Sequence, residues 1–199
     1  MAALDYRTIA APCEGLYKDR GSRFLAYALP AASVEVAMAE VARLRAQHHA
    51  ARHCCYAYVL GAEGDDSRAN DDGEPSGSAG RPILGVLLSR ELRDVLVVVI
   101  RYFGGIKLGV PGLIAAYRGA TEDALDQAEV VVRTVERHYA LRFDYGVQHE
   151  VMEVLKRVEA RVEGQDYGAD CRMRVAWSLA MDDEACQRLE KICGIVAVE

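Results

Sequence analysis

The sequence predicts an α+β protein built from two domains. The first part of the chain alternates apolar runs typical of strands with apolar residues at helical spacing. The predicted elements of the last third follow the order β-α-β-β-α-β, which is the order of a ferredoxin-like domain. The length of 199 residues suits two small domains. We place the boundary where the pattern changes, giving an N-terminal domain of residues 1–132 and a C-terminal domain of residues 133–199.

The first predicted helix of the N-terminal domain has clear start and stop signals. Residues 22–29 are predicted to form a strand that ends at Pro30, and Ser33 is a candidate N-cap for the helix that follows. That helix ends near the pair His48 and His49, and residues 55–60 have the β-branched and aromatic content of a second strand. Its apolar residues share one helical face: Val34, Ala37, Met38, Val41 and Leu44.

A continuous apolar run from Val95 to Ile100 predicts a strand buried on both faces, which places it centrally in its sheet. A short helix over residues 81–89 precedes it, with Pro82 in the first turn. The polar residues 61–80 are predicted to form a long loop, of the kind that is functional or mobile. After the central strand, a glycine-rich loop leads into a helix with the apolar stripe Leu113, Tyr117, Ala120, Ala124 and Ala128.

In the C-terminal domain, apolar and polar residues alternate from Tyr139 to Tyr145, which predicts a strand with one buried face. A helix follows with Val151, Val154, Leu155 and Val158 on one side, and residues 161–167 and 171–179 fit a hairpin. Asp182 is predicted to cap the last helix, which stops at Gly194 before a final strand over residues 195–198.

Composition excludes several classes of protein. Hydrophobic residues make up 51% and charged residues 27% of the chain, as in folded soluble proteins. The longest apolar run is far shorter than the ~20 residues that span a bilayer. The N-terminal residues do not show the pattern of an export leader, so we expect no export. The six cysteines form no Cys-x-x-Cys pair, so we expect reduced thiols in a cytoplasmic protein.

Charge is unevenly distributed along the chain. The net charge is −6, from 24 basic and 30 acidic residues, so the whole molecule is not a generic polyanion binder. Residues 63–74 alone carry six acidic groups and one basic group. Without that segment, the N-terminal domain has 13 basic and 11 acidic residues, a balance of +2, which leaves room for a basic face.

The glycine-rich loop is the first candidate binding site. Glycines let the backbone approach a ligand closely, and the free N–H groups of a helix start favour anions. Arg101 and Lys107 add positive charge, but the spacing matches neither a Walker loop nor Gly-x-Gly-x-x-Gly. A tight crossover packed on the sheet explains the glycines equally well. The glycines are Gly104, Gly105, Gly109 and Gly112.

The acidic loop Asp71, Asp72 and Glu74 invites a metal interpretation. Aligning Gly73 with the invariant glycine of a calcium loop puts Arg68 and Ala79 at positions that require carboxylates, so that hypothesis fails. A magnesium ion needs fewer carboxylates and stays an alternative, although a solvated acidic loop is the more common outcome. The small residues that follow, next to Arg81, could also cup an anion.

His53 is flanked by Arg52 and by two cysteines. A cysteine next to a histidine supplies the residue types of a thiol nucleophile and its general base. Adjacent residues of a strand point to opposite faces, so His53 and Cys54 are not expected to meet. A partly buried histidine with one hydrogen bond is the favoured interpretation. The sequence predicts no catalytic residue, no cofactor and no metal site.

Three segments together resemble the YigZ/IMPACT family: HxCYAY from His53, DDGEPSGSAGRPIL from Asp71, and VVVIRYFGGIKLGVPGL from Val97. The resemblance covers residues 22–128, and the tail looks like the smaller C-terminal domain of that family. One departure is the segment from Gly109 to Leu113, since relatives commonly carry Gly-Thr-Gly-Gly-Leu there. The resemblance therefore does not extend to contacts made through that threonine hydroxyl or that glycine N–H.

The resemblance implies an N-terminal domain with the left-handed βαβ unit of ribosomal proteins and of domain IV of elongation factor G. It implies a C-terminal domain like domain V of that factor. The resemblance also implies a link to translation, because eukaryotic relatives regulate translation by blocking activation of a stress kinase. We expect no counterpart of their RWD domain here, so the chain looks more like the bacterial branch. The resemblance thus supplies a process and not a reaction.

We therefore expect a non-enzymatic, translation-associated protein that contacts RNA or a ribosome-associated protein. The face would combine the glycine loop with Arg52, His53, Arg81, Arg101 and Lys107. A second hypothesis is an enzyme acting on a phosphorylated small molecule, with Asp72 and Glu74 holding magnesium or serving as acid and base. A third is a protein–protein interaction module that acts through the C-terminal domain.

Overall fold

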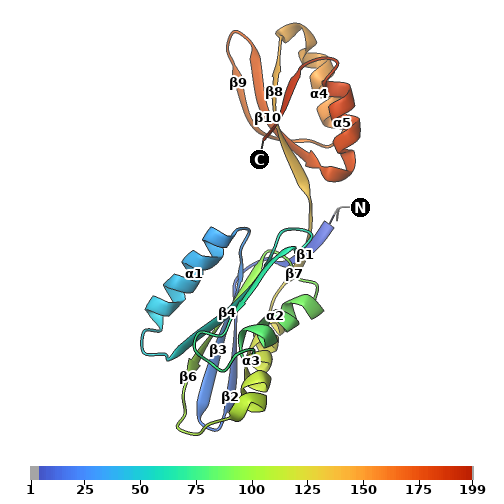
Figure 1. Ribbon diagram of the computed structural model, residues 1–199. Coiled ribbons are helices and arrows are strands. Elements are labelled where there is room, and N and C mark those ends of the chain that lie inside the picture. The colour runs from blue at the N-terminus through green and yellow to red at the C-terminus, as the bar shows by residue number, and fades with distance from the viewer. Residues whose placement is uncertain (1–4, 199) are drawn as a thin grey trace. The chain divides into compact units, whose positions relative to one another are not determined.

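The computed structural model describes residues 5–198, which form two compact units (Figure 1). The N-terminal unit comprises residues 6–133, and the C-terminal unit comprises residues 134–198 together with Asp5. Both units contain helices and strands, so the predicted α+β class is confirmed. No helix in this part of the chain is long and apolar enough to cross a membrane.

The main sheet of the N-terminal unit has the strand order β2-β3-β6-β4-β5, and all neighbouring strands are antiparallel. The apolar run predicted to be central is the middle strand, β6, and its residues 95–101 are all buried. The strands are β2 (Cys13–Asp19), β3 (Ser22–Pro30), β4 (His53–Leu60), β5 (Asp66–Asn70) and β6 (Val95–Tyr102).

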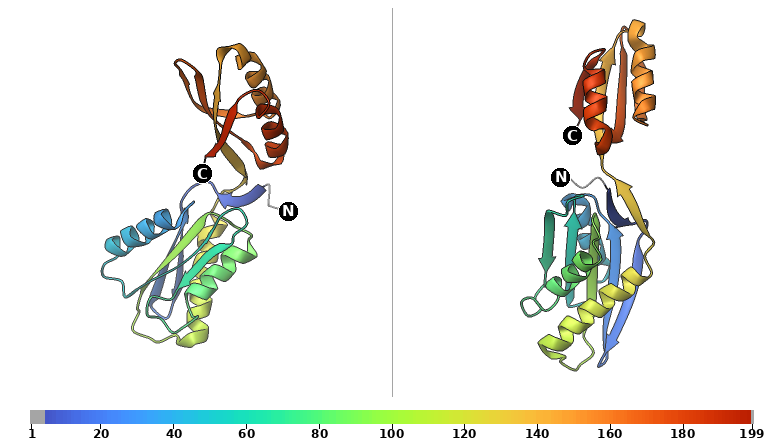
Figure 2. Two further views of the ribbon diagram at one scale, coloured as in Figure 1. Left: turned by 45° about the horizontal axis from the view of Figure 1, so that its top comes forward. Right: turned by 90° about the vertical axis from the view of Figure 1, so that its right-hand side faces the viewer.

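Helices cover both faces of this sheet (Figure 2). Alternate residues of β6 enter different cores: Val97 packs with α2 (Gly80–Ser89) and α3 (Gly109–Asp126), whereas Val98 packs with α1 (Val34–Gln47). This three-layer arrangement explains why β6 has no polar face. A separate two-stranded sheet pairs β1 (Asp5–Ile9) with β7 (Val130–Thr134).

The ends of α1 lie where the sequence predicts them. The Ser33 hydroxyl accepts a hydrogen bond from the N–H of Val36, so Ser33 is the N-cap. The helix ends at the C-cap His48, whose imidazole nitrogens lie 2.9 Å from the hydroxyls of Tyr27 and Tyr102. These contacts fix the end of α1 to two strands of the sheet.

The prediction of an unbroken loop over residues 61–80 is wrong, because β5 lies within it. Its residues Asp66 to Arg68 are exposed, and β5 is held at the sheet edge by backbone pairing with β4. An edge strand needs no apolar side chains for that pairing, so the hydropathy pattern gave no signal.

The C-terminal unit has the predicted succession of elements. Its sheet has the order β11-β8-β10-β9, with all neighbouring strands antiparallel, and α4 and α5 contribute to a single core with its inner face. Two 3-10 turns, η1 (Tyr145–Val147) and η2 (Leu179–Met181), precede the helices. The main elements are β8 (Glu136–Phe143), α4 (Gln148–Arg157), β9 (Arg161–Tyr167), β10 (Cys171–Ser178), α5 (Asp182–Leu189) and β11 (Gly194–Val198).

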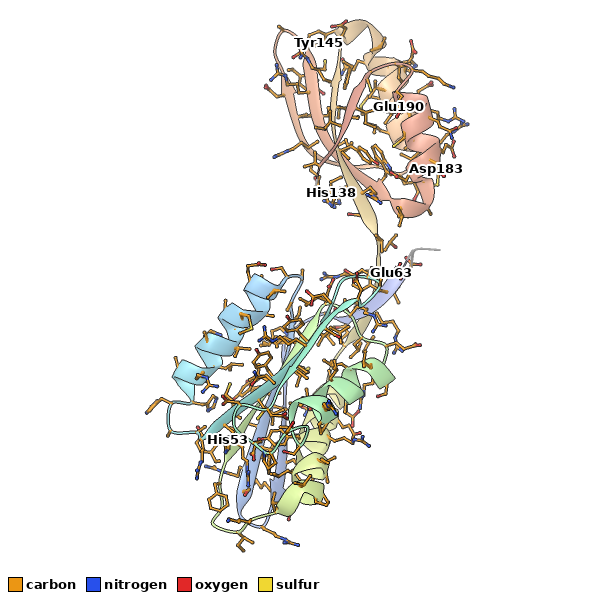
Figure 3. All side chains as sticks on the ribbon, in the orientation of Figure 1. His53, Glu63, His138, Tyr145, Asp183 and Glu190 are labelled. Atoms are coloured by element: carbon orange, nitrogen blue, oxygen red, sulfur yellow. The ribbon has the colours of Figure 1, made fainter. Side chains whose placement is uncertain are left out.

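Three sequence expectations for this unit are corrected. The last helix, α5, ends at Leu189 rather than at Gly194. Asp182 does not cap α5, since the cap residue is Met181. The Asp182 carboxylate instead accepts hydrogen bonds from the Tyr139 hydroxyl at 2.8 Å and from Trp177 Nε1 at 3.0 Å, below two stacked rings. Tyr145 lies beyond β8 in η1 and is 51% exposed (Figure 3) rather than on the buried face of the strand.

Candidate anion-binding pocket

A pocket of about 410 Å³ lies at the N-terminal end of α3. It brings together residues from β4, the β5–α2 connection, β6 and the glycine-rich loop, which are far apart in the sequence. Of the residues predicted to form a binding face, Arg52, His53, Arg101, Lys107 and Gly109 line it. The other lining residues are Glu74, Pro75, Phe103, Leu108, Val110 and Leu113.

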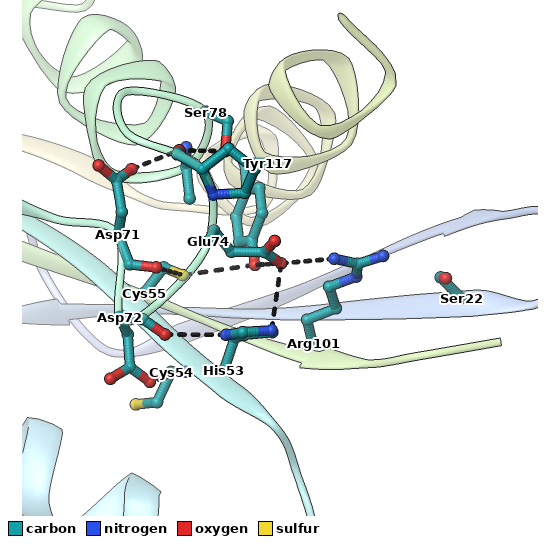
Figure 4. Close-up of polar contacts among 12 residues, drawn as sticks. Ser22, His53, Cys54, Cys55, Asp71, Asp72, Glu74, Ser78, Arg101 and Tyr117 are labelled. Carbon is teal, nitrogen blue, oxygen red and sulfur yellow. Dashed lines mark hydrogen bonds and ion pairs between the residues drawn. The ribbon is translucent and has the colours of Figure 1, made fainter. Parts of the chain in front are cut away.

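Two of the lining residues, Arg101 and Glu74, form a buried ion pair. Arg101 Nη1 lies 2.6 Å from Glu74 Oε1, and the two side chains are 8% and 4% exposed. The same carboxylate oxygen accepts a hydrogen bond from the Tyr117 hydroxyl at 2.9 Å (Figure 4). Burial raises the pKa of Tyr117, so the phenol stays protonated and donates to Glu74.

Arg101 keeps an unused donor despite this pairing. Its Nε is buried and has no hydrogen-bond partner among residues 5–198. The guanidinium also contacts two aromatic rings, with its carbon 5.4 Å from the centre of Phe24 and 5.6 Å from the centre of Phe103. A buried donor without an acceptor is uncommon in folded proteins, and at the wall of a pocket it is a candidate ligand contact.

His53 has a defined orientation at the start of β4. Its Nδ1 lies 2.8 Å from the backbone oxygen of Asp72. A carbonyl oxygen can only accept, so Nδ1 carries the proton and Nε2 is the acceptor nitrogen of the neutral ring. Nε2 lies 3.9 Å from Glu74 Oε1 (Figure 4).

The acidic loop divides into structural and pocket residues. Asp71 accepts hydrogen bonds from the N–H groups of Gly77, Ala79 and Gly80 at the start of α2. Burial by itself raises the pKa of Asp71, but these donors outweigh it and hold the pKa below its ordinary value. Asp71 therefore shapes the turn into α2.

Asp72 also acts inside the fold. Its carboxylate accepts a hydrogen bond from the N–H of Cys54 at 2.7 Å and pairs with Arg45 at 2.6 Å. Neither Asp71 nor Asp72 lines the pocket, so Glu74 is the acidic-loop residue that does. Within residues 5–198, no group of three or more His, Cys, Asp or Glu side chains is arranged to hold a metal ion.

The glycines of the loop have different roles. The N–H of Gly104 donates to Ser22 Oγ, and a Cβ at Gly104 would lie 1.9 Å from the carbonyl carbon of Gly21, so this glycine permits close packing. Gly109 has φ +72° and lines the pocket. Gly105 and Gly112 are not among the lining residues.

Arg81 also lies outside the pocket lining. It is on α2, where its side chain runs beside Gly77 and its charge contributes to the lowered pKa of Asp71. The structure thus places Arg81 with the turn that Asp71 organises.

The N-terminus of α3 supplies further donors. Its cap residue, Leu108, offers no side-chain acceptor, and the first N–H groups of a helix have no partner within the helix. The N–H groups of Gly109 and Val110 form no hydrogen bond within the described part of the chain, and both residues line the pocket. The helix dipole adds to the preference of these groups for an anion.

Two cations of the pocket are unpaired. Arg52 and Lys107 form no hydrogen bond or ion pair with any residue of the described range. With Arg101 and one carboxylate, Glu74, the lining has three positive groups and one negative group, a balance of +2 when His53 is neutral. The pocket is therefore electropositive although the whole chain is acidic.

The neighbouring cysteines, Cys54 and Cys55, are buried. The Cys55 thiol donates to the backbone oxygen of Asp71 at 3.0 Å and contacts the Tyr117 hydroxyl at 3.3 Å. Burial raises the pKa of Cys55 strongly, and it raises the pKa of Cys54 to about 11. Both thiols stay protonated near neutral pH.

Sequence reasoning missed Tyr117 and Phe103. The sequence pattern places Tyr117 only on the apolar stripe of its helix. A buried tyrosine hydroxyl needs a hydrogen-bond partner, and that requirement is the available signal. Phe103 is 48% exposed. Its position beside the glycine loop gave no indication that its ring would lie next to Arg101.

Fold and site together define a two-unit α+β protein whose N-terminal unit carries an electropositive pocket at a helix N-terminus. The family described as the Impact N-terminal domain matches residues 20–125. The chain belongs to the IMPACT family, and the resemblance seen in the sequence is confirmed.

Two of the similar proteins described next match the chain over both units. The chain is 36% identical over 182 residues to the IMPACT family member YigZ of Escherichia coli K12, covering 90% of this chain and 89% of that protein. It is 44% identical over 124 residues to the IMPACT family member YvyE of Bacillus subtilis 168, covering 62% and 57%. A crystal structure described as that of a hypothetical protein has a TM-score of 0.76 and 32% identity, covering 99% and 98% of the two chains.

Proposed function

We propose that this protein is a non-enzymatic, translation-associated regulatory protein that binds RNA through the pocket at the N-terminus of α3. The observation that carries the proposal is the convergence of Arg52, Arg101 and Lys107 with the free N–H groups of Gly109 and Val110. Arginine, lysine and helix N-termini are the groups that contact phosphate oxygens in nucleic acid complexes. The link to translation rests on the family alone.

The finer fold assignments belong to the same proposal. Strands β3 and β4 both pair antiparallel with β6, so they run parallel to each other and α1 connects them across that strand. This connection supports the βαβ unit of ribosomal proteins and of elongation factor G domain IV. The sheet order β11-β8-β10-β9 supports a ferredoxin-like C-terminal domain like domain V of that factor.

Salt-dependent binding to a single-stranded RNA tests the proposal. The variant Arg52→Ala/Lys107→Ala removes two exposed, unpaired cations and leaves the buried Arg101–Glu74 pair intact. The matched control Lys18→Ala/Arg118→Ala removes two exposed cations of the same unit outside the pocket. Fluorescence anisotropy at several salt concentrations gives affinity and salt slope for each.

We expect the pocket variant to weaken binding at low salt and to reduce the slope of log K against log salt by about 1.4, since each single-strand phosphate contact contributes about 0.7. The control variant should change both quantities much less. Absence of RNA affinity at low ionic strength, or equal losses in the two double variants, would contradict the proposal.

One observation favours a second candidate, an enzyme that acts on a phosphorylated small molecule. The Asp72 carbonyl holds the proton of His53 on Nδ1 and leaves Nε2 as a proton acceptor at the pocket, which suits a general base. Nucleotides and sugar phosphates should be screened for turnover with and without magnesium. Turnover that His53→Gln abolishes and Arg43→Ala leaves unchanged would favour the enzyme over the binding protein.

A further inference from the structure

We infer that the pocket takes a terminal phosphomonoester of a molecule that also carries a flat aromatic group, which is the chemistry of the 5′-phosphate end of RNA and of a free mononucleotide. This inference rests on the proposed function, because it names the part of the ligand that enters the same pocket. Four features of the lining support it: its charge, its donors, its aromatic wall and its size.

The charge of the pocket suits a dianion. Arg52, Arg101 and Lys107 against Glu74 leave a balance of +2. A phosphomonoester carries about −1.5 to −2 charges at pH 7, whereas each internal phosphodiester carries one. The monoester therefore matches the charge of the lining more closely than a phosphate within a strand does.

The free hydrogen-bond donors belong to two elements that line the pocket. The N–H groups of Gly109 and Val110 belong to the N-terminus of α3, and the unpaired Nε of Arg101 belongs to β6. Arg101 is 8% exposed, and Glu74 fixes its other side through Nη1. Since Gly109 has no Cβ, an oxygen can approach the backbone closely there. These fixed donors and the unpaired Lys107 suit a group that presents three oxygens.

The rest of the lining is apolar and includes an aromatic ring. Pro75, Leu108, Val110 and Leu113 line the pocket together with Phe103. The Phe103 ring is 48% exposed and lies 5.6 Å from the Arg101 guanidinium. A base that is joined to the phosphate through the ribose can therefore stack next to the phosphate donors, as bases do on exposed aromatic side chains.

The pocket volume also limits the ligand. A volume of about 410 Å³ lies in the range of pockets that enclose small molecules. A site of that size takes one nucleotide rather than a segment of backbone, which needs a continuous groove. One terminal nucleotide is the ligand that fits charge, donors, aromatic wall and size together.

The test compares two single-stranded RNA oligonucleotides of one sequence, one with a 5′-phosphate and one with a 5′-hydroxyl, each labelled at the 3′ end. Calorimetry with a free nucleoside 5′-monophosphate and with the parent nucleoside forms the second arm. We expect the 5′-phosphorylated RNA to bind about tenfold more tightly, the equivalent of one charge-assisted contact. We expect the nucleoside to bind far more weakly than its monophosphate.

The two arms separate the sources of the ligand. Preference for the 5′-phosphorylated RNA with no binding of the monophosphate assigns the pocket to RNA ends. Binding of the monophosphate without RNA affinity assigns it to free nucleotides, keeps this inference and overturns the proposed RNA function. Equal affinity for both RNAs, with no binding of the monophosphate, overturns the inference and leaves RNA binding standing.

Two exposed side chains supply variants that should fold. Lys107→Ala should reduce the preference for the RNA with a 5′-phosphate. Phe103→Leu should lower the affinity for the nucleoside monophosphate about tenfold and leave the affinity for inorganic phosphate unchanged. Lys18→Ala is the control with the same loss of charge outside the pocket. If Phe103→Leu weakened inorganic phosphate and the monophosphate equally, stacking on this ring would be refuted.

Discussion

Replacing Glu74 by alanine should destabilise the protein by about 3–5 kcal/mol, the usual cost of removing one partner of a buried ion pair. The substitution leaves the Arg101 guanidinium without its ion-pair partner. The Arg101 side chain is 8% exposed, and its Nε already has no acceptor. It also removes the acceptor of the Tyr117 hydroxyl, which lies 2.9 Å from the same oxygen. Glu74→Ala therefore leaves one buried charge and one buried hydroxyl without the acceptor that they share.

The matched control is Asp126→Ala, which breaks the ion pair between Asp126 and Arg90. The side chains of that pair are 67% and 31% exposed, so the loss should not exceed about 1 kcal/mol. The double variant Glu74→Ala/Arg101→Met should recover part of the loss of the single variant, since it leaves no buried charge without a partner. The comparison therefore separates burial from the mere presence of an ion pair.

Urea unfolding followed by far-ultraviolet circular dichroism measures these differences. Tryptophan fluorescence does not serve, because the single tryptophan, Trp177, lies in the C-terminal unit and reports on that unit. If Glu74→Ala cost no more than Asp126→Ala, or if adding Arg101→Met deepened the loss, the reasoning from a stranded charge would be refuted.

Three further predictions concern stability and use the same urea assay. The wild type should have a higher free energy of unfolding than Asp71→Asn. This difference should be complete above the pKa of aspartate in the unfolded chain, 3.8, and should disappear as the pH falls through the lower pKa of Asp71 in the folded protein. A difference that does not change with pH would contradict this prediction. Gly104→Ala should lower the free energy of unfolding more than Gly105→Ala does, because the new Cβ at position 104 would lie 1.9 Å from the carbonyl carbon of Gly21. The new Cβ at position 105 would meet no atom within 4 Å, so Gly105→Ala should cost only the about 1–2 kcal/mol of a left-handed backbone, at φ +92°. The reverse order would rule out the close approach. Gly85→Ala, in an exposed turn of α2 with nothing within 4 Å of the new Cβ, should stabilise by about 0.5–1 kcal/mol, and any loss would show an unseen constraint.

Strands with a run of apolar residues could be predicted from the sequence. Strands that depend on packing against distant elements could not. The run from Val95 to Ile100 specified a central strand because every one of its residues is buried. By contrast, β2 contains Gly15, where a Cβ would lie 2.3 Å from the backbone nitrogen of Ala124 in α3. A glycine normally weakens a strand, and its value here depends on a helix more than a hundred residues away.

The same distinction applies to the pocket. Arg52, His53, Arg101 and Lys107 were predicted from local charge beside a strand start and a glycine loop, and the structure brings them to one pocket. The sequence could not indicate that Glu74, 27 residues from Arg101, would be its buried partner. Arg81 was included because it follows a stretch of small residues, but that stretch serves to wrap the carboxylate of Asp71.

The departure at Val110 and Pro111 acquires a physical meaning in the structure. These residues occupy the first turn of α3, where proline is tolerated because an N–H at that position has no partner within the helix. Pro111 therefore costs the helix little, but it removes one donor that a glycine would offer to a ligand, and Val110 lacks a hydroxyl. The remaining backbone donors are those of Gly109 and Val110, so positive side chains must contribute a larger share of any anion binding in this chain. Anion binding should therefore depend mainly on Arg101, Lys107 and Arg52. Binding to this pocket should be more sensitive to salt than binding to a site built from backbone N–H groups alone.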